Sequence, residues 1–363
     1  MNRPLRGAII GFGFIAERGH LPAYRARAGR DVEIVAVSDF CEQRRAMVRE
    51  LLPGAALFED HRALLAQGGL DFVDICTPPG SHAAAAHAAL DRGLHVLCEK
   101  PLATSAEAAR AMLDHASMAR RVIFPCHNYK HAPVVKEVRR IIDSGRIGRV
   151  NMVTLNTLRS THAKGVPQWR PDWRRERALS GGGIAMDHGS HTFYLAFDWL
   201  GSYPTAVTAK THDSGRWDTE DTFSCSLVFP GGVANAHLSW RAGLRKVIYT
   251  ISGEHGGIVV DDDAVEVTVA DGAGGWKSER TSISSHWMDA SHSTWFGTLF
   301  DDFRQAIARG EFVGREAWEA YLCVQLITAA YRSAAGGSRE LALADTDRQY
   351  NLRQAPRTAG AVG

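Results

Sequence analysis

The first third of the chain alternates short apolar runs with stretches of helix-forming residues. The apolar runs are bounded by glycine or by charge, which is typical of strands buried on both faces. Regular alternation of strand and helix predicts a parallel sheet with right-handed crossovers. The expected strands are residues 7–10, 32–37, 71–76 and 95–98, and the expected helices are residues 42–52, 82–90 and 104–119. The last helix opens on Thr104-Ser105-Ala106-Glu107, a capping-box pattern.

Beyond about residue 127 the pattern changes to longer strands in direct succession. Between Thr222 and Phe229 apolar residues alternate with serine and threonine, and Pro230-Gly231-Gly232 leads into a returning strand that alternates up to Trp240. This pattern predicts an antiparallel hairpin. Amphipathic helices are expected near the end of the chain, either covering this sheet or bracing the first domain. The further strands are residues 150–158, 206–211, 247–252 and 265–270, and the late helices are residues 296–309 and 316–333.

Together these patterns predict an α/β chain of two domains. Its 363 residues suit two domains of about 150 residues each. We expect a first domain with a parallel sheet over residues 1–127 and a second α/β domain with a mostly antiparallel sheet over residues 128–353. Residues 354–363 have little apolar content, which is typical of a mobile tail.

Composition narrows the class of ligand. The chain carries 42 Lys and Arg against 40 Asp and Glu, a surplus too small for a nucleic-acid or membrane-surface protein, so a small-molecule substrate is expected. No window approaches the roughly 18 apolar residues that span a bilayer. The six cysteines form no CxxC pair and no HExxH occurs, so we expect a reduced, cytoplasmic setting and no metal site.

The segment Gly11-Phe12-Gly13-Phe14-Ile15-Ala16 fits G-x-G-x-x-A directly after the first strand. A glycine at 11 allows a tight turn, one at 13 lets the backbone approach a pyrophosphate, and a small residue at 16 lets helix and strand pack closely. The helix that follows presents free N–H groups and a positive dipole end to phosphates. We therefore expect a dinucleotide site, the alternative being a glycine turn that only saves space.

Asp39, at the end of the second strand, bears on the choice of dinucleotide. A carboxylate there accepts the hydroxyls of the adenosine ribose and repels a 2′-phosphate, which favours NAD over NADP. Arg44 and Arg45 lie one helical turn further and could soften that preference. The alternative role for Asp39 is that of a helix N-cap.

Two more elements carry chemistry. Cys98-Glu99-Lys100-Pro101 follows a strand at the edge where open parallel sheets bind ligands, so a lysine faces the crevice. Further on, Gly181-Gly182-Gly183 precedes Asp187 and His191, whose i, i+4 spacing puts both on one face of a helix. An imidazole beside a carboxylate is a proton acceptor near neutral pH. The alternative is a capped helix start with a satisfied histidine.

In these motifs, and in Thr77-Pro78-Pro79 followed by His82, the chain resembles the Gfo/Idh/MocA oxidoreductases. The resemblance implies a Rossmann domain joined to an α/β domain whose large open sheet mediates homodimers or homotetramers, and often a cis bond before the proline at 101. It implies Lys100, Asp187 and His191 as the catalytic trio. The implied cofactor-binding residues are Gly11, Gly13, Phe14, Ile15, Ala16, Asp39, Thr77, Pro78, His82, Glu99 and Lys100. The sequence departs from the family pattern at His188 and at Tyr194, where many members have an acidic residue.

The resemblance predicts hydride transfer between NAD and a secondary hydroxyl or ketone of a sugar, sugar acid or cyclitol. In this hypothesis His191 takes the hydroxyl proton, Asp187 holds the imidazole, and Lys100 steadies the developing alkoxide. Two alternatives stay open: a glycosidase that retains NAD through transient oxidation, and a non-catalytic NAD-dependent sensor of the same fold.

The segment before the glycines, residues 162–177, is crowded with tryptophan and arginine. Tryptophan faces pack on sugar rings and guanidinium groups grip anions, so Trp169, Arg170, Trp173 and His188 are expected to contact a substrate that is anionic or carries several hydroxyls. The alternative is a solvated basic loop or an oligomer contact.

Overall fold

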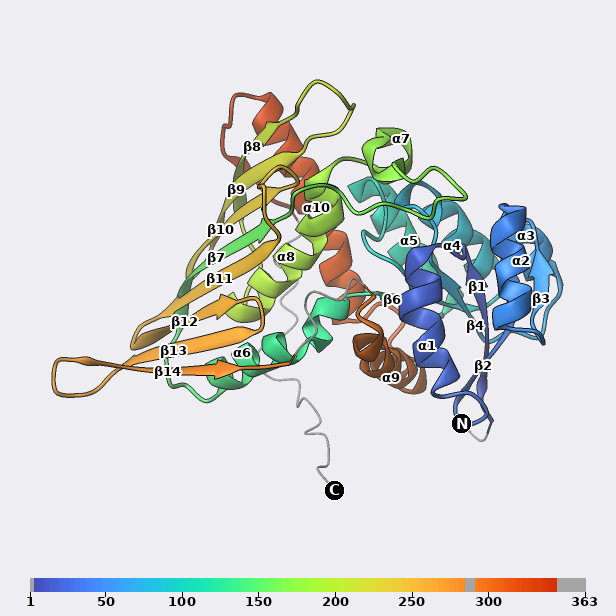
Figure 1. Ribbon diagram of the computed structural model, residues 1–363, viewed down its shortest axis with the longest axis horizontal. Helices are drawn as coiled ribbons and strands as arrows, with labels where there is room; N and C mark the ends of the chain where they lie inside the picture. Colours follow the sequence, from blue (N-terminus) through green and yellow to red (C-terminus); the bar gives the residue numbers. More distant parts are fainter. Residues whose placement is uncertain (1–2, 285–290, 345–363) are drawn as a thin grey trace.

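A computed structural model describes residues 3–284 and 291–344 of the chain. The predicted tail, residues 354–363, lies outside the described residues. Two sheets dominate the structure, with helices α5, α8 and α10 between them (Figure 1). Their bounds are Ala106–Ala119, Ile184–Leu200 and Arg315–Ala335.

The first sheet has six strands, all parallel, in the order β3-β2-β1-β4-β5-β6. This confirms the parallel sheet expected from the first third of the chain. The strands β3 and β6, of three residues each, are too short to show a pattern in the sequence. The bounds are β1 Leu5–Ile10, β2 Val32–Ser38, β3 Ala56–Phe58, β4 Phe72–Ile75, β5 His95–Cys98 and β6 Ile123–Pro125.

Helices connect these strands. The turn after β1 leads into a π-helical segment, which continues as α1. Helix α5 begins one residue later than the capping-box pattern predicts, because Ser105 and not Thr104 is the N-cap: its hydroxyl accepts from the Ala108 N–H at 3.2 Å. The bounds are η1 Ala16–His20, α1 Leu21–Arg25, α2 Glu42–Leu51, α3 His61–Ala66, η2 Pro79–Ser81, α4 His82–Asp91 and η3 Asn128–His131.

The second sheet has nine strands in the order β14-β13-β12-β11-β7-β10-β9-β8-β15. The predicted hairpin is confirmed, since β9 and β10 pair antiparallel through the turn. One neighbouring pair, β10 with β7, is parallel, so the sheet is mostly antiparallel as expected. The bounds are β7 Val150–Leu158, β8 Ala206–His212, β9 Thr222–Phe229, β10 Gly232–Ser239, β11 Lys246–Gly253, β12 Gly256–Asp261, β13 Ala264–Ala270, β14 Trp276–Ser282 and β15 Leu341–Ala342.

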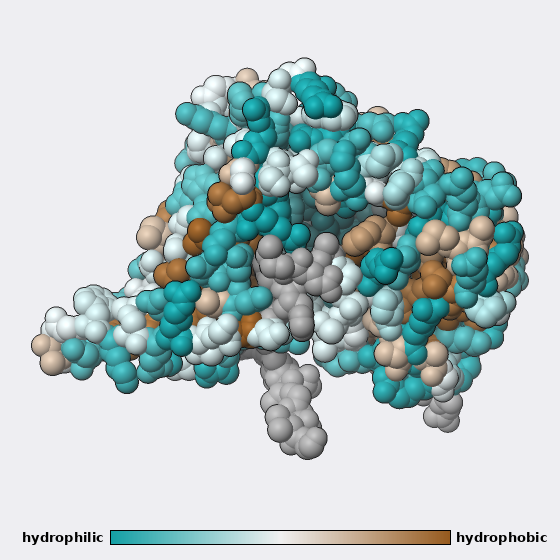
Figure 2. All heavy atoms as spheres, viewed as in Figure 1, coloured by the Kyte–Doolittle hydropathy of each residue, from teal (hydrophilic) through white to brown (hydrophobic). Residues whose placement is uncertain are grey.

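The two faces of the larger sheet differ. Phe223, Leu227 and their neighbours on one face are buried in the core. On the other face Val233 lies between its register partners Met152 and Val228, and all three are more than a third exposed. Hydrophobic residues also interrupt an otherwise hydrophilic surface in Figure 2. An apolar patch on the otherwise polar open face fits the expected contact with a second subunit, which stays a prediction.

Of the two late helices, one packs against the first domain and the other connects the two domains, so both roles expected from the sequence occur. Helix α9, Ser293–Arg309, packs Phe296, Phe300 and Phe303 into the core of the parallel sheet beside Phe72. Helix α10 contacts α5, α8 and β8, so it joins the two halves. Among the helices that the structure describes, none has the length and apolar character that crossing a membrane requires. The remaining bounds are α6 Pro133–Asp143, η4 Trp173–Arg175 and α7 Arg177–Ser180.

Candidate active site

A cleft of about 700 Å³ runs between the two sheets, along the carboxyl ends of the parallel strands. Ligands of open α/β sheets bind at this edge. Both halves of the chain line it, from the glycine turn after β1 to the start of α8. The predicted residues that line it are Gly11, Gly13, Phe14, Ile15, Asp39, Thr77, Pro78, Glu99, Lys100, Trp169, Trp173, Asp187, His188 and His191.

The glycine turn fits a dinucleotide. Gly11 has a φ of +88°, and a Cβ there would lie 2.7 Å from Thr77 Cγ2, so only glycine suits the position. A Cβ on Gly13 would meet no atom within 4 Å, which leaves this backbone open to the cleft. The hydroxyl of Thr77 is buried without a hydrogen-bond partner in the described structure. The turn therefore offers backbone and a hydroxyl to a pyrophosphate. Ala16 is fully buried and packs the turn.

Asp39 is held in place at the end of β2. Its carboxylate accepts from the Phe12 N–H at 2.7 Å and from the Cys41 N–H at 2.8 Å. The N-cap of α2 is Cys41, so the alternative role of Asp39 as that cap is wrong. Arg44 and Arg45 are committed to the chain: Arg44 is 2% exposed and donates to the Phe12 carbonyl, and Arg45 donates to the Asp39 carbonyl.

Trp169 lies at the Asp39 end of the cleft, against expectation. Its ring makes an edge contact with Phe40 at 5.2 Å, and the neighbouring carbonyl of Gln168 accepts from the Cys41 thiol. The segment between β7 and α7 thus reaches across to the parallel sheet (Figure 1). Arg170, which we expected at the substrate, is 57% exposed, pairs with Glu176, and does not line the cleft.

Trp173 and His188 lie at the opposite, Lys100 end. The Arg174 guanidinium stacks on the Trp173 ring at 4.3 Å and reaches the Asp187 carboxylate with Nε at 3.3 Å. His188 Nε2 is 3.7 Å from the same carboxylate. Burial, against the attraction of Asp187, lowers the pKa of His188 to about 3, so this imidazole is neutral at physiological pH.

Lys100 comes from the end of β5, beside the predicted cis bond to Pro101, which the structure confirms. Its ammonium donates to the Asp187 carbonyl at 2.8 Å and lies 3.2 Å from Asp187 Oδ1. A lysine that follows β5 and an aspartate near the start of α8 therefore meet at this point. Burial alone would raise the pKa of Asp187, but the charges of Lys100 and Arg174 hold it well below its usual range, so the carboxylate is ionised.

Glu99 and His82, two of the predicted cofactor-binding residues, stabilise the backbone around Lys100. Glu99 accepts from the Lys100 N–H at 3.1 Å and from His20 Nε2, while His20 Nδ1 contacts Asp74 at 2.7 Å. Burial favours the neutral imidazole, but the charge and hydrogen bond of Asp74, together with the neighbouring thiols of Cys76 and Cys126, outweigh burial and raise the pKa of His20 well above its usual value. His82 is fully buried, with its ring nitrogens at the Thr77 and Pro101 carbonyls. Both side chains brace the cleft wall.

The three glycines before Asp187 make room for two neighbours. A Cβ on Gly182 would overlap the Tyr331 hydroxyl, and one on Gly183 would overlap the Glu220 carbonyl. The Glu220 carboxylate accepts from the Gly183 and Ala185 N–H groups, both at 2.9 Å, and so caps the start of α8. No sequence pattern indicated this cap, because it comes from a distant segment.

His191 lies on the same helix as Asp187, but Asp187 does not hold its imidazole. Its Nδ1 is 2.7 Å from the Tyr194 hydroxyl, and its ring stacks on Tyr129 at 3.8 Å. Burial, together with the nearby charge of Lys100, holds the pKa of His191 well below its usual value, so the imidazole is neutral. The sequence signal for this partner was the i, i+3 spacing from His191 to Tyr194.

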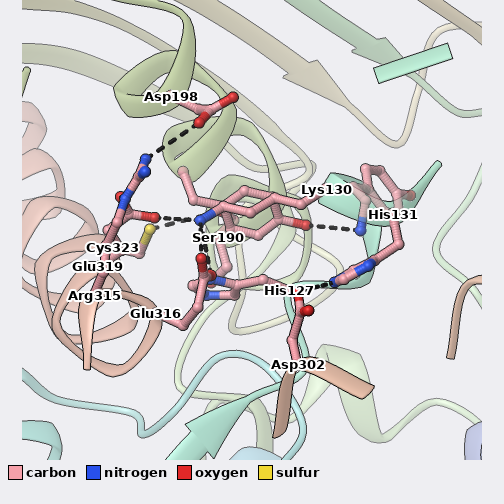
Figure 3. Close-up of polar contacts among 12 residues, drawn as sticks. His127, Lys130, His131, Ser190, Asp198, Asp302, Arg315, Glu316, Glu319 and Cys323 are labelled. Atoms are coloured by element: carbon pink, nitrogen blue, oxygen red, sulfur yellow. Dashed lines mark hydrogen bonds and ion pairs between the residues drawn. The ribbon is translucent and has the colours of Figure 1, made fainter. Parts of the chain in front are cut away.

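A buried ion cluster holds the segment that carries Tyr129 (Figure 3). Lys130 pairs with Glu316 at 2.7 Å and with fully buried Glu319, both on α10. Arg315 links Glu319 to helix α8, because its Nε lies 2.7 Å from Glu319 Oε1 and its Nη2 lies 3.2 Å from Asp198 Oδ1. The ammonium of Lys130 lies between the two carboxylates, so the chain itself supplies their countercharge. The cluster fixes Tyr129, and through it His191, against α10.

Comparison with known proteins agrees with this architecture. Residues 5–127 match the model of the oxidoreductase family with an NAD-binding Rossmann fold, and residues 135–259 match the GFO/IDH/MocA C-terminal domain. The chain is 30% identical to D-glucoside 3-dehydrogenase of Escherichia coli (strain K12) over 68% of its own length and 73% of that protein.

Two further similarities cover nearly the whole chain. Inositol 2-dehydrogenase of Rhizobium meliloti (strain 1021) is 27% identical over 91% of this chain and 97% of that one. The solved structure of levoglucosan dehydrogenase in complex with NADH and levoglucosan superposes with a TM-score of 0.81, over 94% of this chain and all of that one, at 23% identity. The chain belongs to the Gfo/Idh/MocA family of oxidoreductases, which carry a nicotinamide cofactor on a Rossmann domain.

Proposed function

We propose that the protein is an NAD-dependent dehydrogenase that oxidises a secondary hydroxyl of a sugar, sugar acid or cyclitol, or reduces the corresponding ketone. The observation that carries the proposal is the meeting of Lys100 with Asp187 at 2.8 and 3.2 Å, on the same cleft as His191. An ammonium and a neutral imidazole at one end of a dinucleotide cleft can share the charge and the proton of an alcohol as it is oxidised.

In this mechanism each side chain has a separate task. The bound nicotinamide supplies the hydride acceptor. His191 takes the hydroxyl proton on Nε2, because Nδ1 is engaged with the Tyr194 hydroxyl. That hydroxyl can accept from an Nδ1–H, which leaves Nε2 unprotonated, the tautomer a base requires. Lys100 stabilises the negative charge that develops on the substrate oxygen, and Asp187 holds the ammonium in position.

For the cofactor we propose NAD. Two backbone N–H groups fix the Asp39 side chain where the adenosine ribose would lie, and a carboxylate at this position repels a 2′-phosphate. Arg44 and Arg45 offer such a phosphate little, since both guanidinium groups are already bonded to the chain. Trp169 and exposed Phe40 line the same end of the cleft and would contact the adenine.

The test is NADH production, followed at 340 nm, with a panel of sugars, sugar acids and cyclitols. We expect Lys100→Met and His191→Ala each to lower kcat by about 100-fold or more. The matched controls are Lys210→Met and His237→Ala, exposed positions on β8 and β10 away from the cleft, and these should keep wild-type turnover. Near-native turnover in both cleft variants would remove the proposal.

A second candidate is a glycosidase that retains NAD and regenerates it in each cycle. The contact between Trp169 and Phe40 favours it, because the substrate half of the chain covers the nucleotide end of the cleft. Protein purified without added nucleotide would then carry NAD and cleave glycosides with no net NADH. Free exchange of NAD in dialysis, with NADH accumulating, would support the dehydrogenase instead. A protein that binds NAD and turns over nothing would be a sensor.

A further inference from the structure

We infer that Arg174 is a positioning residue of the proposed reaction, which holds the Asp187 carboxylate so that the Lys100 ammonium keeps its charge for the substrate oxygen. The inference rests on the proposed function and assigns a further residue to the same site. Arg174 lines the cleft from η4, whereas Lys100 follows β5 and Asp187 lies near the start of α8. Three separate segments of the chain therefore supply the three charges.

Both cations reach the same oxygen of Asp187. Lys100 Nζ lies 3.2 Å from Oδ1, and Arg174 Nε lies 3.3 Å from it. The other oxygen, Oδ2, lies 3.7 Å from His188 Nε2. Lys100 also donates to the Asp187 backbone carbonyl at 2.8 Å. These bonds use two of the three N–H groups of the ammonium, and the third can reach a substrate oxygen in the cleft.

The Arg174 side chain is held in one direction by its own segment. Its Nη1 donates to the Ala163 carbonyl at 3.2 Å, and its guanidinium carbon lies 4.3 Å from the centre of the Trp173 ring. Trp173 packs closely on Gly165, where a Cβ would lie 2.8 Å from Trp173 Cδ1. These contacts fix the guanidinium beside Asp187, and a fixed donor is what a positioning residue requires.

The segment itself is anchored to the larger sheet by the next residue, Arg175. This side chain is buried, and its guanidinium carbon lies 4.5 Å from the centre of the Trp240 ring, directly after β10. Arg175 Nε donates to His162 Nδ1 at 3.2 Å, and His162 Nε2 contacts Asp172 at 2.6 Å. We therefore expect that replacing Arg174 alone leaves the segment in place.

The charges that meet here explain why a second cation is useful. Asp187 is ionised, and His188 and His191 are neutral, so one carboxylate is in contact with two cations. With Lys100 alone, the ammonium and the carboxylate would cancel. Arg174 leaves one net positive charge among the three groups, and this charge stabilises an alkoxide that forms beside Lys100.

The experiment is a double-mutant cycle between Arg174→Met and Asp187→Asn on the full-length protein with NAD. The substrate is the sugar or cyclitol that the wild-type protein oxidises fastest. We expect Arg174→Met to lower kcat about tenfold, with KM for NAD within about twofold of wild type. In the Asp187→Asn background the same substitution should change kcat by less than about twofold, because a residue that acts through Asp187 has no effect once that carboxylate is gone.

Two further variants and a second measurement complete the design. Arg174→Lys should restore part of kcat, since it keeps the charge and loses the planar set of N–H donors. Arg170→Met is the matched control and should keep wild-type kcat, because Arg170 lies on the same segment, pairs with Glu176 and does not line the cleft. Urea unfolding of the four proteins of the cycle needs no turnover, and we expect their free energies of unfolding to be non-additive.

The outcomes separate the role of Arg174 from the proposed function. An equal loss of kcat from Arg174→Met in the wild-type and Asp187→Asn backgrounds overturns the inference, because Arg174 then acts without Asp187. Wild-type kcat in Arg174→Met, or additive free energies of unfolding, overturns it as well. If no probe yields NADH, the dehydrogenase proposal fails, and the unfolding cycle alone then decides whether Arg174 holds Asp187.

Discussion

The fixed carboxylate of Asp39 predicts that NADPH binds much more weakly than NADH. Two unit charges that are held about 4 Å apart repel by about 1 kcal/mol in water and about 4 kcal/mol at an effective dielectric of 20, and these energies bound the repulsion between Asp39 and a neighbouring 2′-phosphate. The phosphate carries more than one charge, so the penalty is at least about 2 kcal/mol, or about 30-fold in Kd. Neither Arg44 nor Arg45 can offset it cheaply, because moving either breaks a bond to the chain.

The assay is titration of the protein with NADH and with NADPH, followed by quenching of tryptophan fluorescence. Asp39→Asn removes the charge and should narrow the NADPH-to-NADH ratio of Kd values by about tenfold. Glu42→Gln removes an exposed carboxylate at the start of α2 and is the charge-matched control. NADPH binding within threefold of NADH in the wild-type protein, or a ratio that Asp39→Asn leaves unchanged, would refute the reasoning.

Three further predictions follow from the site. Tyr194→Phe removes the partner of His191 Nδ1 and should lower kcat about tenfold with little change in KM, as expected of a positioning residue; a loss confined to thermal stability would contradict this. Trp169→Ala should raise the Kd for NADH about tenfold by loss of stacking, whereas Trp276→Ala, 68% exposed on β14, should not; equal effects would contradict a role at the adenine. His188 has a pKa of about 3 in the folded state, below the unfolded value of 6.5. Its contribution to the free energy of unfolding is therefore present above pH 6.5 and is lost as the pH falls toward 3, at up to about 1.4 kcal/mol per pH unit. Urea unfolding at pH 7 and at pH 5 measures this loss, and His188→Gln should reduce the difference in unfolding free energy between the two pH values.

The sequence predicted the fold well where hydrophobic periods are long. Thr222–Phe229 and Val150–Leu158 have the bounds expected, since alternation over eight or nine residues leaves one register for a half-buried strand. Ala56–Phe58 was missed, because three residues cannot show a period. The parallel pairing of β10 with β7 joins strands far apart in the chain, and no local pattern encodes it.

The site residues that belong to a local sequence motif could be predicted. Those whose position depends on a partner distant in the sequence could not. Lys100 and Asp187 were expected from their motifs, and the structure brings them together. Trp169, expected at the substrate, lies at the Asp39 end of the cleft, since the direction in which a loop crosses is set by contacts such as that with Phe40. Arg159, which lines the cleft, follows an ordinary strand and carries no motif.

The two halves of the proposed catalytic site are each anchored within buried polar networks, and this determines how they can move. Glu99 and His20 hold the backbone at Lys100, while the cluster around Lys130 holds Tyr129 beneath His191. Breaking a buried ion pair costs several kcal/mol, so neither network yields easily. The bonds from Lys100 to Asp187 are fewer, and they join the segment after β5 to helix α8 at the cleft. We therefore expect a rotation of one half against the other to change the contact between Lys100 and Asp187 before it disturbs the networks behind it.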